Sequence, residues 1–190
     1  MDTTMLTNIE IASLLIGGIA GSYLLGAFAW SIIFPGRRVW PPTEATSGIK
    51  IRVWLATVAI FAATVMLGVA NWNSFHWPAP VRWGVGVPLI LIGNLVVWMG
   101  VFKIGLGTTN GEIAELKTDG LYGFSRNPQY MADMAILLGW AVLSASGWAI
   151  IVACIGIIVL AAAPFAEEPW LEEAYGENYI AYTSQTRRYL

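Results

Sequence analysis

Long uncharged stretches alternate with short polar segments along this chain. Residues 11–34 carry no charge over 24 positions, and residues 53–70 and 85–102 form two further uncharged stretches of 18 positions each. A helix needs about 20 apolar residues to cross about 30 Å of hydrocarbon, because it rises 1.5 Å per residue. The pattern therefore predicts three membrane-spanning helices in the first part of the chain.

The apolar run from Met131 to Phe165 contains a single charge, Asp133, and is too long for one span. Near its middle, residues 144–147 read Ser-Ala-Ser-Gly, which are small, turn-forming residues. We expect a tight helical hairpin there, giving a fourth and a fifth span. The predicted fold is an all-α integral membrane helical bundle of about five transmembrane helices, with a helical hairpin toward its C-terminal end.

Composition supports this fold and excludes other classes of protein. Hydrophobic residues make up 57% of the 190 positions and charged residues only 12%, which is too apolar for a soluble domain of this length. The net charge of -2 offers no basic footprint for nucleic acid. One cysteine and one histidine, with no cluster of His, Cys and carboxylates at ligand spacing, predict no metal site.

The positive charges predict an orientation. If the N-terminus is outside, nine of the ten Lys and Arg residues fall on the cytoplasmic side, and only Arg82 falls outside. The first ten residues, MDTTMLTNIE, contain no basic residue, so we expect a retained membrane helix and not a cleaved signal. The sequence predicts an integral membrane protein with its N-terminus outside and its C-terminus in the cytoplasm.

The stretch SRNPQY, residues 125–130, precedes the fourth predicted span. Pro128 disfavours the α conformation at Asn127 and suits the first helical position, so we expect Asn127 to be the N-cap. Arg126 and the free N–H groups of the helix start then make a small anion site, flanked by Tyr122 and Tyr130. The alternative is that Arg126 is a topological anchor and that the tyrosines are interface residues.

A second polar constellation covers residues 163–182. We expect Pro164 to end or kink the fifth span and Pro169 to begin a new helix, so that Glu167 and Glu168 lie in the joint between them. Two carboxylates would then sit at the membrane surface.

We expect a short amphipathic tail on the cytoplasmic surface after this second constellation. Gly176 is expected to close the preceding helix, and residues 177–187 to form another that places Tyr179 and Tyr182 on one face. Such a tail, lying on the membrane surface, explains these aromatic residues without any ligand.

The motifs GLYGFSRNPQY (120–130), LGW (138–140) and EEPWLEEAYGENYIAY (167–182) together resemble one superfamily of membrane methyltransferases. It contains the isoprenylcysteine carboxyl methyltransferases and the phospholipid (phosphatidylethanolamine) N-methyltransferases, and the resemblance covers roughly residues 103–188. It implies one membrane domain over residues 1–190, with three N-terminal spans in 1–102 and a cofactor-binding part in 103–190. The implied methyl donor is S-adenosylmethionine, and the acceptor is a lipid or lipidated molecule from the bilayer. The residues implied around the cofactor are Gly120, Tyr122, Arg126, Asn127, Tyr130, Glu167 and Glu168.

Departures from the family pattern leave the acceptor open between a phospholipid amine and an isoprenylcysteine carboxylate. The isoprenylcysteine enzymes usually have histidine where Asn127 stands, and an arginine shortly before the paired glutamates, where residues 163–166 read Ala-Pro-Phe-Ala. The tail YGENY, residues 175–179, is nevertheless more similar to the isoprenylcysteine branch. Two other classes also remain: a membrane reductase that uses NADPH, and a non-enzymatic membrane protein that packs or binds partners through its glycine-rich first span.

Overall fold

The structure is a computed structural model that describes residues 7–42, 47–104 and 116–189. The long helices are α1 (Asn8–Ile33), α2 (Ser47–Ala70), α4 (Val87–Ile104), α7 (Pro128–Ser144) and α8 (Gly147–Tyr175). The short elements are η1 (Pro35–Arg37), α3 (Ala79–Val81), η2 (Arg82–Gly86), α6 (Leu121–Phe124) and α9 (Glu177–Gln185). These residues contain no strand, so the predicted all-α fold is confirmed.

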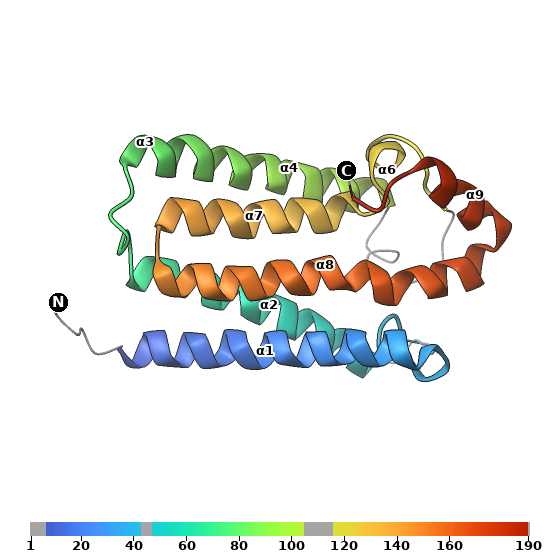
Figure 1. Cartoon of the computed structure of the whole chain (residues 1–190), viewed down its shortest axis with the longest axis horizontal. Coiled ribbons are helices and arrows are strands. Elements are labelled where there is room, and N and C mark those ends of the chain that lie inside the picture. Colours follow the sequence, from blue (N-terminus) through green and yellow to red (C-terminus); the bar gives the residue numbers. More distant parts are fainter. Residues whose placement is uncertain (1–6, 43–46, 105–115, 190) are drawn as a thin grey trace.

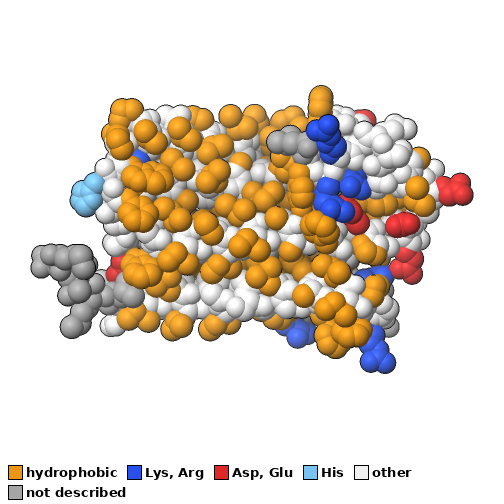
Figure 2. Space-filling view, viewed as in Figure 1, with side chains coloured by type: hydrophobic (Ala, Val, Ile, Leu, Met, Phe, Trp, Pro, Cys, Tyr) orange, Lys and Arg blue, Asp and Glu red, His pale blue; other side chains and the backbone are white. Residues whose placement is uncertain are grey.

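The long helices lie side by side, with α7 between α4 and α8 (Figure 1). Four segments are long and apolar enough to cross a membrane: α1, α2, α8 and the continuous stretch from α3 through η2 into α4. With α7, which has 17 residues, the bundle contains about five helices of transmembrane length, as predicted. Hydrophobic side chains cover the flank of the bundle, whereas charged side chains gather at the end where α8 meets α9 (Figure 2). The chain is an integral membrane protein.

The predicted hairpin joins α7 to α8 at the opposite end of the bundle. Ala145 adopts a left-handed conformation, with φ of 45°, and reverses the chain. The Ser146 hydroxyl then accepts a hydrogen bond of 3.2 Å from the Ala149 N–H and caps α8. Small side chains are required here because residues 144–146 are completely buried. The hairpin is therefore confirmed.

Glycines set how closely the helices approach. A Cβ atom on Gly139 of α7 would lie 2.8 Å from the carbonyl oxygen of Gly86, so only glycine allows the two backbones to meet there. Gly17 and Gly21 of α1 lie against side chains of α8, whereas at Gly18 such a Cβ would meet no atom of another described element within 4 Å. The glycine-rich first span therefore packs within the chain at these two positions.

The expected joint near Glu167 and Glu168 is wrong, because α8 runs without a break through Pro164 and Pro169. Prolines are tolerated inside a membrane helix where neighbouring groups satisfy the carbonyls that they disturb. The Tyr189 hydroxyl donates a 2.5 Å hydrogen bond to a carbonyl of α8 in the turn before Pro164. Both glutamates consequently stand on one continuous helix.

The tail agrees with its prediction in part: a helix follows Gly176, but it ends at Gln185 and not at residue 187, and its tyrosines pack within the protein and line the cavity described below, which a helix lying on the membrane surface does not explain. Gly176, with φ of 56°, ends α8, and α9 follows at once. Tyr179 and Tyr182 are both buried on one face of α9, where they pack with Tyr122. The aromatic face of α9, which Tyr179 and Tyr182 form, is thereby turned toward the rest of the protein.

Candidate functional site

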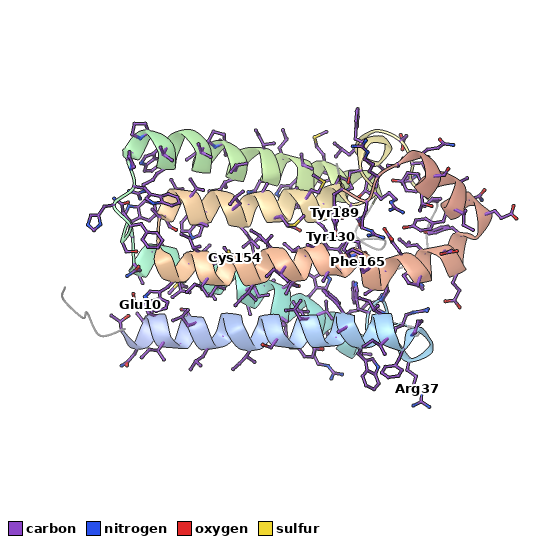
Figure 3. The ribbon with its side chains drawn as sticks, viewed as in Figure 1. Glu10, Arg37, Tyr130, Cys154, Phe165 and Tyr189 are labelled. Carbon is purple, nitrogen blue, oxygen red and sulfur yellow. The ribbon has the colours of Figure 1, made fainter. Side chains whose placement is uncertain are left out.

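A cavity of about 240 Å³ lies within the charged end of the bundle. Helices α1, α2, α7, α8 and α9 contribute to its wall, together with the connection between α1 and α2. Figure 3 shows Tyr130 at this end of the bundle, with Phe165 and Tyr189 nearby and Glu10 at the other end. The polar and large aromatic residues of the cavity wall include Trp40, Trp54, Thr57, Lys117, Tyr122, Arg126, Asn127, Gln129, Tyr130, Asp133, Glu167, Trp170, Tyr175, Tyr179 and Tyr182.

Glu167 joins three parts of the chain inside this cavity. Its Oε1 accepts a 2.6 Å hydrogen bond from the indole N–H of Trp40, which follows η1. The same oxygen accepts a hydrogen bond from the hydroxyl of Tyr130 on α7. A single carboxylate of α8 therefore fixes the position of two aromatic side chains that come from distant segments.

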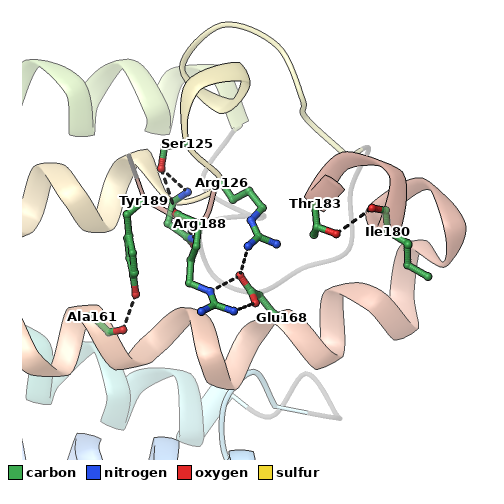
Figure 4. A network of polar contacts seen from close by, with 9 residues as sticks. Ser125, Arg126, Ala161, Glu168, Ile180, Thr183, Arg188 and Tyr189 are labelled. Atoms are coloured by element: carbon green, nitrogen blue, oxygen red, sulfur yellow. Dashed lines mark hydrogen bonds and ion pairs between the residues drawn. The ribbon is translucent and has the colours of Figure 1, made fainter. Parts of the chain in front are cut away.

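Glu168 lies beside the cavity and holds two arginines (Figure 4). Arg188 donates to both of its carboxylate oxygens, from Nε at 2.8 Å and from Nη2 at 2.5 Å. Arg126 Nη2 lies 3.3 Å from Oε1 of the same carboxylate. The hydrogen bonds to Glu168 also raise the pKa of Arg188 above its ordinary value, so this guanidinium stays charged.

Asn127 occupies the N-cap position of α7, and Pro128 is the first helical residue, as predicted. Its side chain does not cap the helix, however, so that part of the prediction is wrong. The amide Nδ2 donates instead to the carbonyl of Arg188 at 3.0 Å, and the Ser125 hydroxyl donates to the same carbonyl at 3.2 Å. The Asn127 side chain therefore bonds to the segment after α9 and not to the first turn of α7. This bond ties that segment to the start of α7.

Three tyrosines form one wall of the cavity at its charged end. The hydroxyl of Tyr182 donates to the carbonyl of Tyr122 at 2.6 Å, and the rings of Tyr179 and Tyr182 lie 6.2 Å apart. Burial raises the pKa of Tyr182 to about 12, although Arg126 opposes the shift, and burial raises the pKa of Tyr122 and Tyr179 as well. At neutral pH all three hydroxyls are therefore uncharged.

The structure brings five of the seven predicted cofactor residues into the cavity wall. These are Tyr122, Arg126, Asn127, Tyr130 and Glu167. Gly120 is exposed where α6 begins, with φ of 60°, and Glu168 faces the two arginines. Part of the polar loop before Gly120, residues 105–115, lies outside the described residues.

Sequence reasoning missed the contribution of the first two spans to the site. Trp40, Trp54 and Thr57 line the cavity, although the expected cofactor-binding part began at residue 103. Nothing in the local sequence around these residues indicates contact with α7 or α8. In the sequence Asp133 is the single charge of an apolar run, and an ionisable residue inside a span is itself a signal of function.

The groups on the wall fit S-adenosylmethionine, which carries a carboxylate, an ammonium, ribose hydroxyls and a sulfonium. The Nε of Arg126 is buried and has no hydrogen-bond partner among the described residues, so the wall retains a donor for an anion. Glu167 offers an acceptor for an ammonium or for hydroxyls, and the tyrosine faces suit a sulfonium.

A family model described as phospholipid methyltransferase matches residues 81–178, about half of the chain. The matched segment includes all seven predicted cofactor residues and the elements η2, α4, α6, α7 and α8. No curated protein and no solved structure matches the chain.

Proposed function

We propose that this chain, which belongs to the phospholipid methyltransferase family, methylates the amine of a membrane lipid with S-adenosylmethionine as the donor. The observation that carries the proposal is the double character of the cavity. Its wall is ionic and aromatic near α9 and largely apolar toward α1 and α2. A polar donor and a lipid acceptor can therefore meet in it.

The apolar side of the cavity reaches the flank of the bundle. Trp54 of α2 lines the cavity and is also 43% exposed on the surface that faces hydrocarbon. A lipid can enter from the bilayer past this residue, while the donor enters from the charged end. In the proposed orientation, that end is cytoplasmic and the N-terminus is outside.

The chain itself binds and aligns the reactants. Arg126 would hold the donor's carboxylate, Glu167 its ammonium or ribose hydroxyls, and Tyr122 would offer its aromatic face. When bound there, S-adenosylmethionine supplies an electrophilic methyl carbon whose bond electrons leave with the sulfur. The reaction needs no covalent nucleophile of the protein, because alignment of acceptor, methyl and sulfur supplies most of the acceleration.

An amine suits the cavity better than a carboxylate as the acceptor. Residues 163–166 provide no cation near the paired glutamates, and Arg126 is assigned to the carboxylate of the donor. A prenylcysteine carboxylate would enter a wall that carries the carboxylates of Asp133 and Glu167. An ammonium meets the opposite charge there.

Titration of the purified full chain with S-adenosylmethionine, S-adenosylhomocysteine and NADPH tests this proposal. We expect saturable binding of the first two and none of NADPH. Tyr130→Ala should weaken this binding, whereas the matched control Ile180→Ala, on the exposed face of α9, should not. Binding of NADPH alone would support the reductase, and binding of none of the three would support a non-enzymatic role. Methyl transfer to a prenylcysteine but not to a phospholipid amine would overturn the assigned acceptor.

A further inference from the structure

We propose that Asp133 is the catalytic residue that holds the ammonium of the acceptor lipid and removes its proton before methyl transfer. This inference rests on the proposed function and adds the residue that prepares the acceptor for reaction. It does not concern the residues that hold the donor.

Asp133 stands on the same face of α7 as Tyr130, almost one turn farther from the charged end. It lies five residues after Pro128, which places it about 7.5 Å along the helix axis from the start of α7. Its side chain lines the cavity, to which Phe28, Thr57 and Leu160 also contribute. The carboxylate is thus inside the membrane span and open to the space that a ligand would fill.

The carboxylate of Asp133 has no hydrogen bond or ion pair within the part of the chain that the structure describes. The other two carboxylates of the region differ in this respect: Glu167 accepts from Trp40 and Tyr130, and Glu168 faces two arginines. A carboxylate within a span is costly and is retained where it pairs with another group. The missing partner of Asp133 is therefore a group that the ligand brings.

The negative charge of Asp133 and the composition of the cavity wall both indicate that this partner is a cation. The cationic side chains of the described cavity wall, Lys117 and Arg126, both precede α7 in the chain, at the charged end. The residues that α1 and α2 contribute to the wall are mostly apolar, and a low dielectric strengthens the attraction between a carboxylate and an ammonium. The apolar wall also accommodates the glycerol and acyl part of a lipid, so a lipid amine fits better than a free amine.

The chemistry requires such a group. An aliphatic amine is protonated at neutral pH, since its pKa lies near that of lysine, about 10.4, and its nitrogen then has no free electron pair. The Asp133 carboxylate accepts one proton from the ammonium and becomes a neutral carboxylic acid. The freed nitrogen pair forms the new bond to the methyl carbon as the carbon–sulfur bond breaks and its electrons go to sulfur. The products are a methylated ammonium and a neutral thioether, and Asp133 returns its proton to water.

The test compares the parent protein with Asp133→Asn, which has the same shape but no charge. The full chain in nanodiscs is titrated first with S-adenosylhomocysteine, and then with dihexanoyl phosphatidylethanolamine in its presence. For Asp133→Asn we expect unchanged S-adenosylhomocysteine binding, amine-lipid binding about 10- to 100-fold weaker, and a loss of methyl transfer of at least about 100-fold. Glu173→Gln, which removes an exposed carboxylate outside this cavity, is the matched control and should behave as the parent.

Two further probes separate the possible outcomes. Dihexanoyl phosphatidylglycerol, which lacks the amine, should bind parent and variant alike, and free ethanolamine should bind far more weakly than the amine lipid. Equal amine-lipid binding and methylation by parent and Asp133→Asn would overturn the role of Asp133 alone. Equal binding of ethanolamine and the lipid would overturn the lipid assignment. If the parent does not bind S-adenosylhomocysteine, the proposed function fails, and this inference with it.

Discussion

Arg188 and Glu168 form a bidentate ion pair that joins the segment after α9 to α8, with hydrogen bonds of 2.8 Å and 2.5 Å. Arg126, which lines the cavity, faces the same carboxylate. Glu168 therefore orients Arg126 without itself lining the cavity. The two glutamates therefore have different roles: Glu167 lines the cavity, and Glu168 positions Arg126 beside it.

Glu168→Gln should consequently impair the site through the arginines. Without the carboxylate charge, Arg126 and Arg188 repel each other, and we expect the free energy of unfolding to fall by about 1 to 3 kcal/mol. Binding of S-adenosylhomocysteine should weaken as Arg126 loses its orientation. Calorimetric titration and denaturation of the variant measure both effects. An unchanged affinity with reduced stability would assign Glu168 a purely structural role.

Arg126→Lys separates the two interpretations of SRNPQY. Lysine keeps the charge that anchors the topology but loses the planar fork that binds a carboxylate. We expect membrane insertion to stay normal and S-adenosylmethionine binding to weaken by about 1.5 to 3 kcal/mol. The control Arg37→Lys changes an exposed arginine outside the cavity and should bind normally. Normal binding by Arg126→Lys would identify Arg126 as an anchor only.

Gly139→Ala should separate α7 from η2 and from the start of α4. The added methyl group would lie 2.8 Å from the backbone oxygen of Gly86, which cannot move aside as a flexible side chain can. We expect a loss of about 1 to 3 kcal/mol in the free energy of unfolding, typical of overpacking. Gly18→Ala, at an open position of α1, should be neutral or slightly stabilising. Unfolding of both variants in the same detergent gives the comparison.

Docking of α9 should weaken in strong base. The pKa of Tyr182 is about 12 in the folded protein, because of burial, and about 10 in the unfolded chain. Between these values the unfolded state has lost a proton that the folded state keeps, so stability is full below pH 10 and falls as pH rises through 12. Near-ultraviolet circular dichroism against pH follows this loss, and Tyr182→Phe should make it shallower. Spectrophotometric ionisation of all seven tyrosines near pH 10 would contradict it.

A topology reporter tests the orientation. Because nine of the ten basic residues lie on one predicted side, we expect a reporter fused after Leu190 to be active in the cytoplasm. The matched fusion places the same reporter before Met1, where it should be active outside. Activity of the C-terminal fusion on the outer side would reverse both the orientation and the face from which the donor enters.

Sequence predicted the helices better than it predicted the site. The spans and the hairpin at Ala145 follow from local apolar length and small residues, which are properties of neighbouring positions. The continuity of α8 through Pro164 was missed because it involves a hydroxyl from Tyr189, which is distant in sequence. The role of Trp40 was missed for the same reason, since only the folded bundle brings it to Glu167.

The meeting of Trp40, Tyr130 and Glu167 has a consequence for biosynthesis. Because a chain is made from its N-terminus, the first two spans enter the membrane while α8 has not yet been synthesised. Buried residues of these spans, such as Leu24, Ile60 and Leu67, then face lipid or a chaperone until α8 arrives to cover them. Assembly of the cavity is therefore a late event, and substitutions at Glu167 should lengthen the time for which the nascent protein is exposed to membrane quality control.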